Sequence, residues 1–167
     1  KGIVTGYKGA EPTYLHTIDP TKSELYGGQQ QTFVAPYTKC NRIEDYRTAW
    51  AHFEKIFNTI YRFYNIVDDA EITMEANPDD LSDEYVSMLS TLSFNRISIG
   101  IQSFNDKTLK LLNRRHNSTQ AIEAFNYCRK YGFQNISLDL MYGLPGESME
   151  SWGKDLDIIT KLNPEHI

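Results

Sequence analysis

The chain has 167 residues and a formal net charge of -5, and this length fits one domain or a piece of a larger one. It has no basic block, which argues against nucleic acid as the main partner, and no apolar run near the ~20 residues of a membrane span. The two cysteines, Cys40 and Cys128, are too few for a disulfide framework. With the lack of a signal-peptide pattern, they predict a cytoplasmic protein. Because the chain starts at Lys1 and stops in what looks like the opening of another strand, we expect it to be an excerpt.

Residues 1–42 are predicted to be an irregular N-terminal segment. The patterns at 1–7 and 32–37 permit short strands, but residues typical of loops lie between them, including three consecutive glutamines. Gly27 and Gly28 either let the backbone approach a ligand or form a plain turn, and the plain turn is the simpler interpretation.

Residues 43–167 are predicted to be β/α repeats, beginning with a long helix over 43–64. Its large apolar residues recur at spacings of three and four, which predicts one stripe that packs into the core. Strands are expected at 70–76, 95–101 and 134–141. Further helices are expected after the N-caps Ser82, Asn105 and Ser118, and a last helix over 149–162 is expected to bury Trp152, Leu156, Ile159 and Leu162. Cys128 falls on an apolar helix face, which predicts a core thiol.

Each strand has one aliphatic face and one small or polar face. The polar faces consist of Glu71, Thr73 and Glu75, then Ser98, Gly100 and Gln102, then Ser137 and Asp139. Because helices would cover the aliphatic faces, we expect the polar faces to line a ligand cavity. Alternating strands and helices predict a parallel α/β sheet, either doubly wound or part of a (β/α) barrel. No G-x-G-x-x-G follows a strand, and a polar inward face favours a wide, incomplete barrel.

Three candidate ligand groups stand near strand ends, where both folds bind their ligands. Asp139 suits the two hydroxyls of a ribose, or it caps a nearby loop. Glu75 suits a ligand ammonium, or it forms an ion pair with Arg96 or another neighbour. Gln102 suits an adenosine sugar or a carboxylate, or it bonds to a neighbouring strand. In residues 114–116 (RRH), an arginine is suited to clamp a carboxylate, although surface charge is the commoner explanation.

Four motifs occur in order at 74–78 (MEANP), 95–104 (NRISIGIQSF), 113–116 (NRRH) and 139–146 (DLMYGLPG). Together they strongly resemble the oxygen-independent coproporphyrinogen III oxidase family of radical S-adenosylmethionine proteins. The pattern looks most like the oxidase-like branch regarded as haem chaperones. The resemblance covers about residues 58–167, and it implies that the chain is a fragment of a six-stranded partial barrel, (β/α)6.

The resemblance also implies cofactors, ligand contacts and a reaction. The cofactors are S-adenosylmethionine and a [4Fe-4S] cluster. Carried over residue by residue, Glu75, Gln102, Arg114 and Asp139 contact S-adenosylmethionine, with Arg114 at the methionine carboxylate and Asp139 at the ribose hydroxyls. The implied reaction is oxidative decarboxylation of the propionates of coproporphyrinogen III through a 5′-deoxyadenosyl radical. The alternatives are a chaperone that binds haem and delivers it to a partner, or an inactive barrel fragment.

The chain departs from the family at its cluster motif. The family carries C-x-x-x-C-x-x-C, whose three thiolates hold the cluster, and this sequence has no such motif. A glycine-rich G-G-G-T-P segment is missing as well. We therefore assign no metal ligand and no catalytic residue, and we expect this chain alone to be inactive. We interpret the departure as a missing N-terminal part of the barrel rather than as loss of the cluster.

Overall fold

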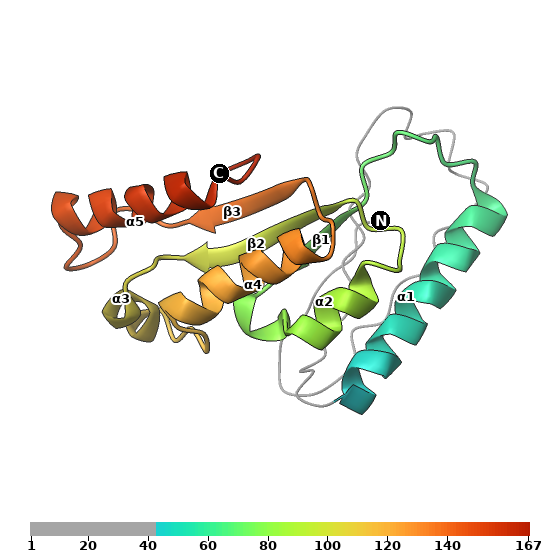
Figure 1. The fold of residues 1–167 in the computed structure, drawn as a ribbon, viewed down its shortest axis with the longest axis horizontal. Coiled ribbons are helices and arrows are strands. Elements are labelled where there is room, and N and C mark those ends of the chain that lie inside the picture. Colours follow the sequence, from blue (N-terminus) through green and yellow to red (C-terminus); the bar gives the residue numbers. More distant parts are fainter. Residues whose placement is uncertain (1–42) are drawn as a thin grey trace.

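The computed structural model describes residues 43–167 (Figure 1). Its elements are α1 (Ile43–Phe63), β1 (Thr73–Ala76), the short 3₁₀ helix η2 (Pro78–Asp80), α2 (Asp83–Leu89), β2 (Arg96–Gln102), α3 (Asp106–Leu111), α4 (Ser118–Lys130), β3 (Ile136–Leu140) and α5 (Met149–Leu162). The short strands expected at 1–7 and 32–37, and the turn expected at Gly27 and Gly28, lie outside the described residues.

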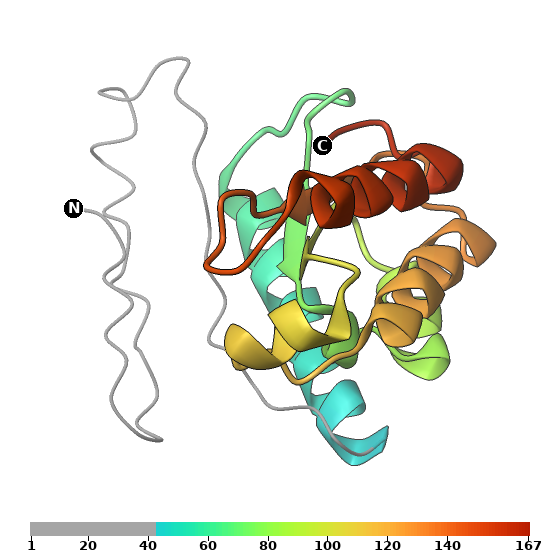
Figure 2. The same ribbon diagram turned by 90° about the vertical axis from the view of Figure 1, so that its left-hand side faces the viewer.

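The three strands form one parallel sheet in the order β1-β2-β3, as the alternation of strands and helices predicts. Helices α2, α4 and α5 lie on one side of this sheet (Figure 2), and α1 packs against α2. The other side of the sheet carries the polar residues. The α/β class and the parallel arrangement are confirmed, and the strands have the connectivity of part of a (β/α) barrel.

The core fills the helix-covered side of the sheet. Ile97, Ile99 and Ile101 of β2 are completely buried, and between them lie half-buried small or polar residues. These isoleucines belong to one cluster with Val86, Leu89, Ala121, Phe125, Cys128, Ile136, Leu138 and Ile159. Burying one such aliphatic side chain contributes about 1.5–3 kcal/mol, so the helix-covered face holds the sheet and fixes which face stays polar. Cys128 is a core thiol as predicted, and burial raises its pKa to about 12.

Most helix starts agree with the sequence, but one N-cap prediction is wrong. Ser82 accepts from the Tyr85 amide at 3.2 Å, and Asn105 caps α3. Helix α4 begins one residue earlier than expected, with Asn117 rather than Ser118 as its N-cap. The reason is a capping box: Asn117 Oδ1 accepts from the Gln120 amide and Gln120 Oε1 accepts from the Asn117 amide, both at 2.9 Å.

The last helix has the predicted bounds but not the predicted buried face. Leu156 was expected in the core and is 38% exposed, whereas Asp155 is only 3% exposed. Asp155 faces inward because its carboxylate accepts two hydrogen bonds from the loop after β2. Past α5, His166 forms a parallel bridge to Ser137, so the chain returns alongside β3.

Candidate functional site

The candidate site lies on the polar face of the sheet, at the carboxyl ends of the strands. Glu75 of β1 is the register partner of Ser98 of β2, and Gly100 of β2 is the partner of Asp139 of β3. Side chains at paired positions of a parallel sheet point to the same face. The alternation predicted from the sequence therefore brings Glu75, Ser98 and Asp139 together on that face.

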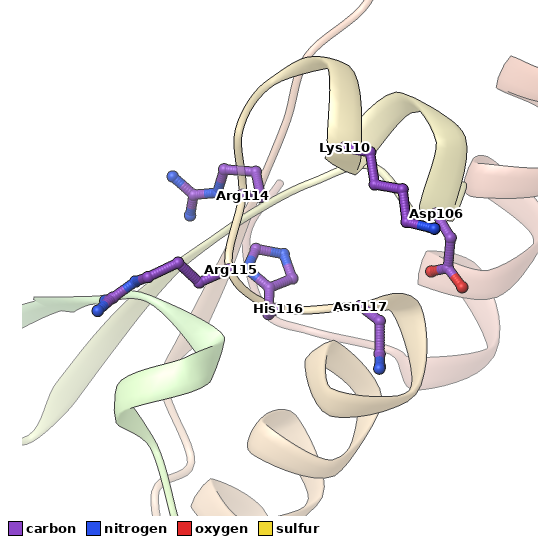
Figure 3. Close-up of a pocket in the computed structure, with 6 residues that line it drawn as sticks. All are labelled: Asp106, Lys110, Arg114, Arg115, His116 and Asn117. Atoms are coloured by element: carbon purple, nitrogen blue, oxygen red, sulfur yellow. The ribbon is translucent and has the colours of Figure 1, made fainter. Parts of the chain in front are cut away.

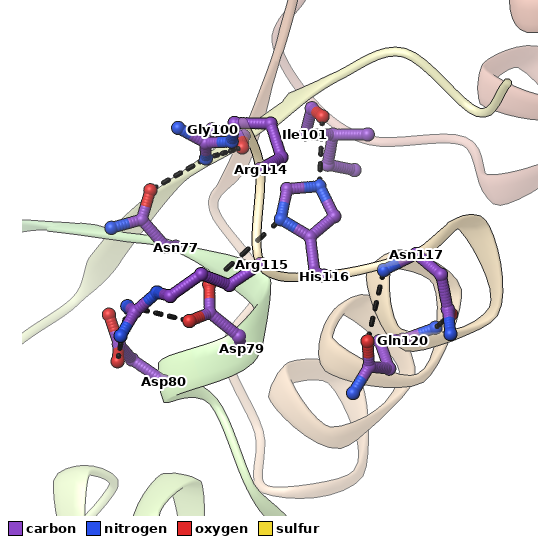
Figure 4. Close-up of polar contacts among 10 residues, drawn as sticks. All are labelled: Asn77, Asp79, Asp80, Gly100, Ile101, Arg114, Arg115, His116, Asn117 and Gln120. Carbon is purple, nitrogen blue, oxygen red and sulfur yellow. Dashed lines mark hydrogen bonds and ion pairs between the residues drawn. The ribbon is translucent and has the colours of Figure 1, made fainter. Parts of the chain in front are cut away.

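Arg114 reaches this face from the loop between α3 and α4. Its Nη2 atom donates to the carbonyl oxygen of Gly100 at 2.5 Å and to Oδ1 of Asn77 at 2.6 Å (Figure 4). Within residues 43–167, the Nε and Nη1 atoms of this guanidinium have no hydrogen-bond partner. Arg114 is therefore fixed through one nitrogen, and other donors stay available for an anionic group of a ligand.

Gly100 lets the polar groups converge. A Cβ atom at this position would lie 2.9 Å from Nε2 of Gln102, 3.4 Å from Nη2 of Arg114 and 3.8 Å from Oδ1 of Asn77. Three polar side chains from three separate segments thus meet over one glycine. Any larger residue at position 100 would take the space that these groups share.

Gln102 ends β2 with an unusual backbone. Its φ is 70°, in the left-handed region, and the register between β2 and β3 shifts between Gly100 and Gln102. Its carbonyl oxygen accepts from the Met141 amide at 2.9 Å. The side-chain amide has no hydrogen-bond partner in the described part of the chain, so the alternative of a bond to a neighbouring strand is wrong. This amide is free to bind a ligand as donor and as acceptor.

The two carboxylates also keep most of their hydrogen-bonding capacity. Ser98 Oγ donates to both oxygens of Asp139, at 3.3 and 3.4 Å, which are long contacts. Glu75 is exposed and makes no ion pair with the described residues. The alternative of a Glu75 ion pair with Arg96 is wrong, because Arg96 lies 3.9 Å from Glu71 and donates to Thr73 instead.

A partly buried network of ion pairs and hydrogen bonds lies next to Arg114 (Figure 4). Arg115 Nη2 lies 2.6 Å from Asp79 and 3.4 Å from Asp80, both in the short helix after β1. His116 is 3% exposed, and its Nε2 donates to the Ile101 carbonyl at 3.1 Å. The network joins the loop after β1 to the loop that carries Arg114.

Two groups of this network have shifted pKa values. Burial lowers the pKa of His116, so its imidazole is neutral at pH 7. Burial, with the neighbouring Asp79 carboxylate, raises the pKa of Asp80 to about 6. The sequence analysis did not single out Asp80, and it named His116 only as part of the basic cluster and the motif, with no role of its own. The signal for them was the pair of acidic residues directly after Pro78, which faces the basic residues of the later loop.

A cavity of about 310 Å³ lies beside the same loop (Figure 3). Its lining residues are Asp106, Lys110, Arg114, Arg115, His116 and Asn117. The start of α4 borders it, but the amides there are already paired: Ser118 donates to Asp106 at 2.8 Å, and Asn117 and Gln120 cap each other. These amides are not available to an anion, so we place the candidate site on the sheet face and not in this cavity.

Comparison with known proteins identifies the class. The model of the Radical SAM superfamily matches residues 43–159, and the chain belongs to this superfamily. Proteins of this class use S-adenosylmethionine together with a [4Fe-4S] cluster. No helix within residues 43–167 is long and apolar enough to cross a membrane.

Relatives of this chain include haem chaperones and oxygen-independent coproporphyrinogen III oxidases, which confirms the resemblance. The chain is 42% identical over 97 residues to the haem chaperone HemW of Lactococcus lactis, covering 58% of this chain and 26% of that protein. It is 34% identical over 175 aligned positions to the oxygen-independent coproporphyrinogen III oxidase of Synechocystis, covering 99% of this chain and 35% of that protein. The chain thus spans about a third or less of these relatives.

A solved structure supports the fold. The radical SAM coproporphyrinogen III oxidase HemN of Escherichia coli superposes with a TM-score of 0.64 at 30% identity, over 70% of this chain and 27% of that chain. The methyltransferase TsrM of Kitasatospora setae, at 14% identity and a TM-score of 0.56, shares the fold alone. The expected partial barrel of radical SAM type is therefore confirmed for the matched residues.

The described residues fit one cofactor of the class and not the other. Arg114 and Gln102 have unused donors, and the carboxylates of Glu75 and Asp139 keep unused acceptor capacity. These groups suit a ligand with an amino-acid group and a ribose, such as S-adenosylmethionine. No group of three or more His, Cys, Asp or Glu residues suited to hold a metal exists within 43–167. Cys128, the one cysteine there, is buried with a raised pKa. These residues do not fit an iron-sulfur cluster.

Proposed function

We propose that Glu75, Gln102, Arg114 and Asp139 bind S-adenosylmethionine in the whole protein that contains this chain. The observation that carries the proposal is the convergence of Arg114 and Gln102 over Gly100, each with hydrogen-bonding groups that no described residue uses. A half-buried arginine held by one nitrogen is a preformed donor site for a carboxylate.

Each residue has a role in this proposal. Arg114 binds the methionine carboxylate, and Glu75 accepts from the ammonium group. Asp139 accepts from the two ribose hydroxyls, since a carboxylate offers two acceptor oxygens to a diol. Gln102 donates to or accepts from the sugar or the carboxylate. The β/α repeats of residues 43–167 supply this half of the site.

The whole protein is proposed to act in porphyrin metabolism, as an oxidoreductase related to coproporphyrinogen III oxidase. In the whole protein, S-adenosylmethionine would supply the radical chemistry of this class of reaction, and Glu75, Gln102, Arg114 and Asp139 would hold it. The chain's own residues bind and orient the cofactor. This chain alone is proposed to be inactive, because its described residues offer no cluster ligands. The low cysteine content, two in 167 residues, supports a cytoplasmic setting.

The second candidate function is haem binding and delivery to a partner. It is favoured by identities of 42% and 38% to haem chaperones of Lactococcus lactis and Bacillus subtilis, above the 34% to the Synechocystis oxidase. The porphyrin, either coproporphyrinogen III or haem, is thus the proposed small-molecule partner in both candidates.

Two assays separate the candidates. The whole protein is reconstituted with iron and sulfide and incubated with S-adenosylmethionine, a reductant and coproporphyrinogen III. An oxidase gives 5′-deoxyadenosine and a decarboxylated porphyrinogen. A chaperone gives no decarboxylated product and binds haem stoichiometrically, with a shift of the Soret band. No deoxyadenosine from a protein with an intact cluster would rule out the catalytic function.

Cofactor binding is tested directly by calorimetry with S-adenosylmethionine. Arg114→Lys keeps the charge but loses the planar fork, so we expect affinity to fall at least about tenfold. Arg62→Lys makes the same change on the exposed surface of α1 and serves as the matched control. Equal affinities of the two variants would contradict the role of Arg114.

A further inference from the structure

The backbone of Gln102 is the strained point of the candidate site. Its φ of 70° lies in the left-handed region, which residues with side chains rarely adopt. This conformation coincides with the register shift after Gly100, and it places the Gln102 amide over that glycine. Something in the surrounding structure must hold the chain in this form.

Two sets of contacts hold it, one at Gln102 itself and one at the two residues that follow it. On the strand side, the Met141 amide of the β3 end donates to the Gln102 carbonyl at 2.9 Å. On the other side, Asp155 of α5 accepts from Ser103 Oγ at 2.6 Å and from the Phe104 amide at 3.0 Å. The two residues that follow Gln102 are therefore fixed to a helix that is 51 to 52 positions away in the sequence.

Asp155 is an unexpected residue at its position. It is 3% exposed, and it makes no ion pair within residues 43–167. A buried carboxylate without a counter-ion is costly unless hydrogen bonds replace its hydration. Asp155 has two such bonds, and both go to the segment directly after Gln102. An apolar side chain there would pack into the core but would leave the Phe104 amide without its acceptor.

We propose that Asp155 is a positioning residue that holds Gln102 in its left-handed conformation, so that the Gln102 amide stays over Gly100 beside Arg114. Asp155 does not itself touch the ligand space. Its hydrogen bonds to Ser103 and Phe104 fix the backbone after Gln102, and this backbone sets the direction in which the Gln102 side chain points. The consequence for cofactor affinity rests on the proposed function, because it requires that Gln102 contacts S-adenosylmethionine.

The first test is S-adenosylmethionine affinity, measured by calorimetry on the purified protein. Asp155→Ala removes both acceptors, and we expect about a tenfold loss, the equivalent of one lost hydrogen bond at Gln102. Asp155→Asn should stay near the parent affinity, because its oxygen still accepts from Phe104 and its amide can donate to Ser103 Oγ. Asp157→Ala, at an exposed position of the same helix, is the matched control and should have no effect.

The double variant distinguishes positioning from general support of the fold. In a Gln102→Ala background, Asp155→Ala should cause no further loss, because the side chain that it positions is gone. A second, independent tenfold loss in that background would overturn the proposal. If Asp155→Ala does not fold, Ser103→Ala replaces it. This variant removes the bond to Oδ2 of Asp155 and the acceptor of the Asn105 amide, and it changes the side-chain volume little.

The second test does not depend on the ligand. In a crystal structure of Asp155→Ala, or of Ser103→Ala, we expect φ of Gln102 to leave the positive region and its amide to leave Gly100. Retention of the left-handed conformation would overturn the proposal, even if affinity changed. If the parent protein binds no S-adenosylmethionine, the proposed function fails, and the φ angle still decides whether Asp155 positions Gln102.

Discussion

Arg114 donates from Nη2 to the side-chain oxygen of Asn77 at 2.6 Å, and this bond joins the loop after β1 to the loop between α3 and α4. The same nitrogen donates to the Gly100 carbonyl, so three segments meet at one atom. Because a hydrogen bond to a charged group is among the stronger ones, the guanidinium is fixed before any ligand arrives. The predictions below test what this arrangement requires.

Gly100→Ala should impair binding more than folding. The new Cβ would lie 2.9 Å from Nε2 of Gln102, which is the end of a flexible side chain and can move away. We expect S-adenosylmethionine affinity to fall about tenfold, with little change in the melting temperature. Gly153→Ala is the control, because a Cβ there meets nothing within 4 Å. In the interior of α5 it should stabilise the protein by about 0.5–1 kcal/mol and leave affinity unchanged.

Asp80→Asn should stabilise the protein at neutral pH. The folded pKa of Asp80, about 6, is above its ordinary value of 3.8, so the folded state binds the proton more tightly than the unfolded state. This carboxylate therefore costs stability above about pH 6, and the cost disappears as the pH falls toward 4. Urea denaturation should show a larger gain for the variant at pH 7.5 than at pH 4.5. An equal gain at both pH values would contradict the raised pKa.

His116→Phe should show the opposite pH dependence. Burial lowers the pKa of His116 below its ordinary 6.5, so the unfolded state binds a proton at this residue more tightly than the folded state does. The parent protein, which contains His116, therefore loses folding stability as the pH falls below 6.5. At pH 7.5 the variant should be about 1 kcal/mol less stable, since the bond to the Ile101 carbonyl is lost. This deficit should shrink at pH 5.5 in the same denaturation assay.

Cys128 should be inert to thiol reagents in the folded protein. It is fully buried, and burial raises its pKa to about 12, so almost no thiolate exists at pH 8. In a Cys40→Ser variant, which leaves Cys128 as the remaining cysteine, labelling by a disulfide reagent should proceed only as fast as the protein unfolds. Labelling that is fast in buffer and no faster in urea would contradict this prediction.

The sequence predicted the sheet and its two faces well, because alternation along a strand is a local property. The isoleucines of β2 and the caps Ser82 and Asn105 stand where their patterns placed them. The strand ends were less exact: β1 covers Thr73–Ala76 rather than 70–76, since ladder pairing with β2 starts only at Thr73. Pairing of this kind depends on the neighbouring strand and cannot be read from one segment.

The ligand role of the four candidate residues stays a prediction, but their geometry explains what the sequence could not provide. Helical periodicity put Leu156 in the core, yet Asp155 is buried there because of bonds to residues more than 50 positions away. The same applies to Asn77, whose contact with Arg114 spans 37 positions. The sequence also does not predict the left-handed backbone of Gln102, because glycine or asparagine is the usual residue at such a position.

Strand β2 is hydrogen-bonded on both sides, to β1 and to β3. Amide protons there exchange with solvent only when the whole sheet opens, whereas the loops that carry Arg114 and Asn77 exchange through small local openings. We therefore expect β2, which lies beneath the candidate site, to exchange more slowly than the two loops beside it. A ligand bound over Gly100 would therefore be detected in deuterium exchange as slowing of those two loops, with β2 itself unchanged.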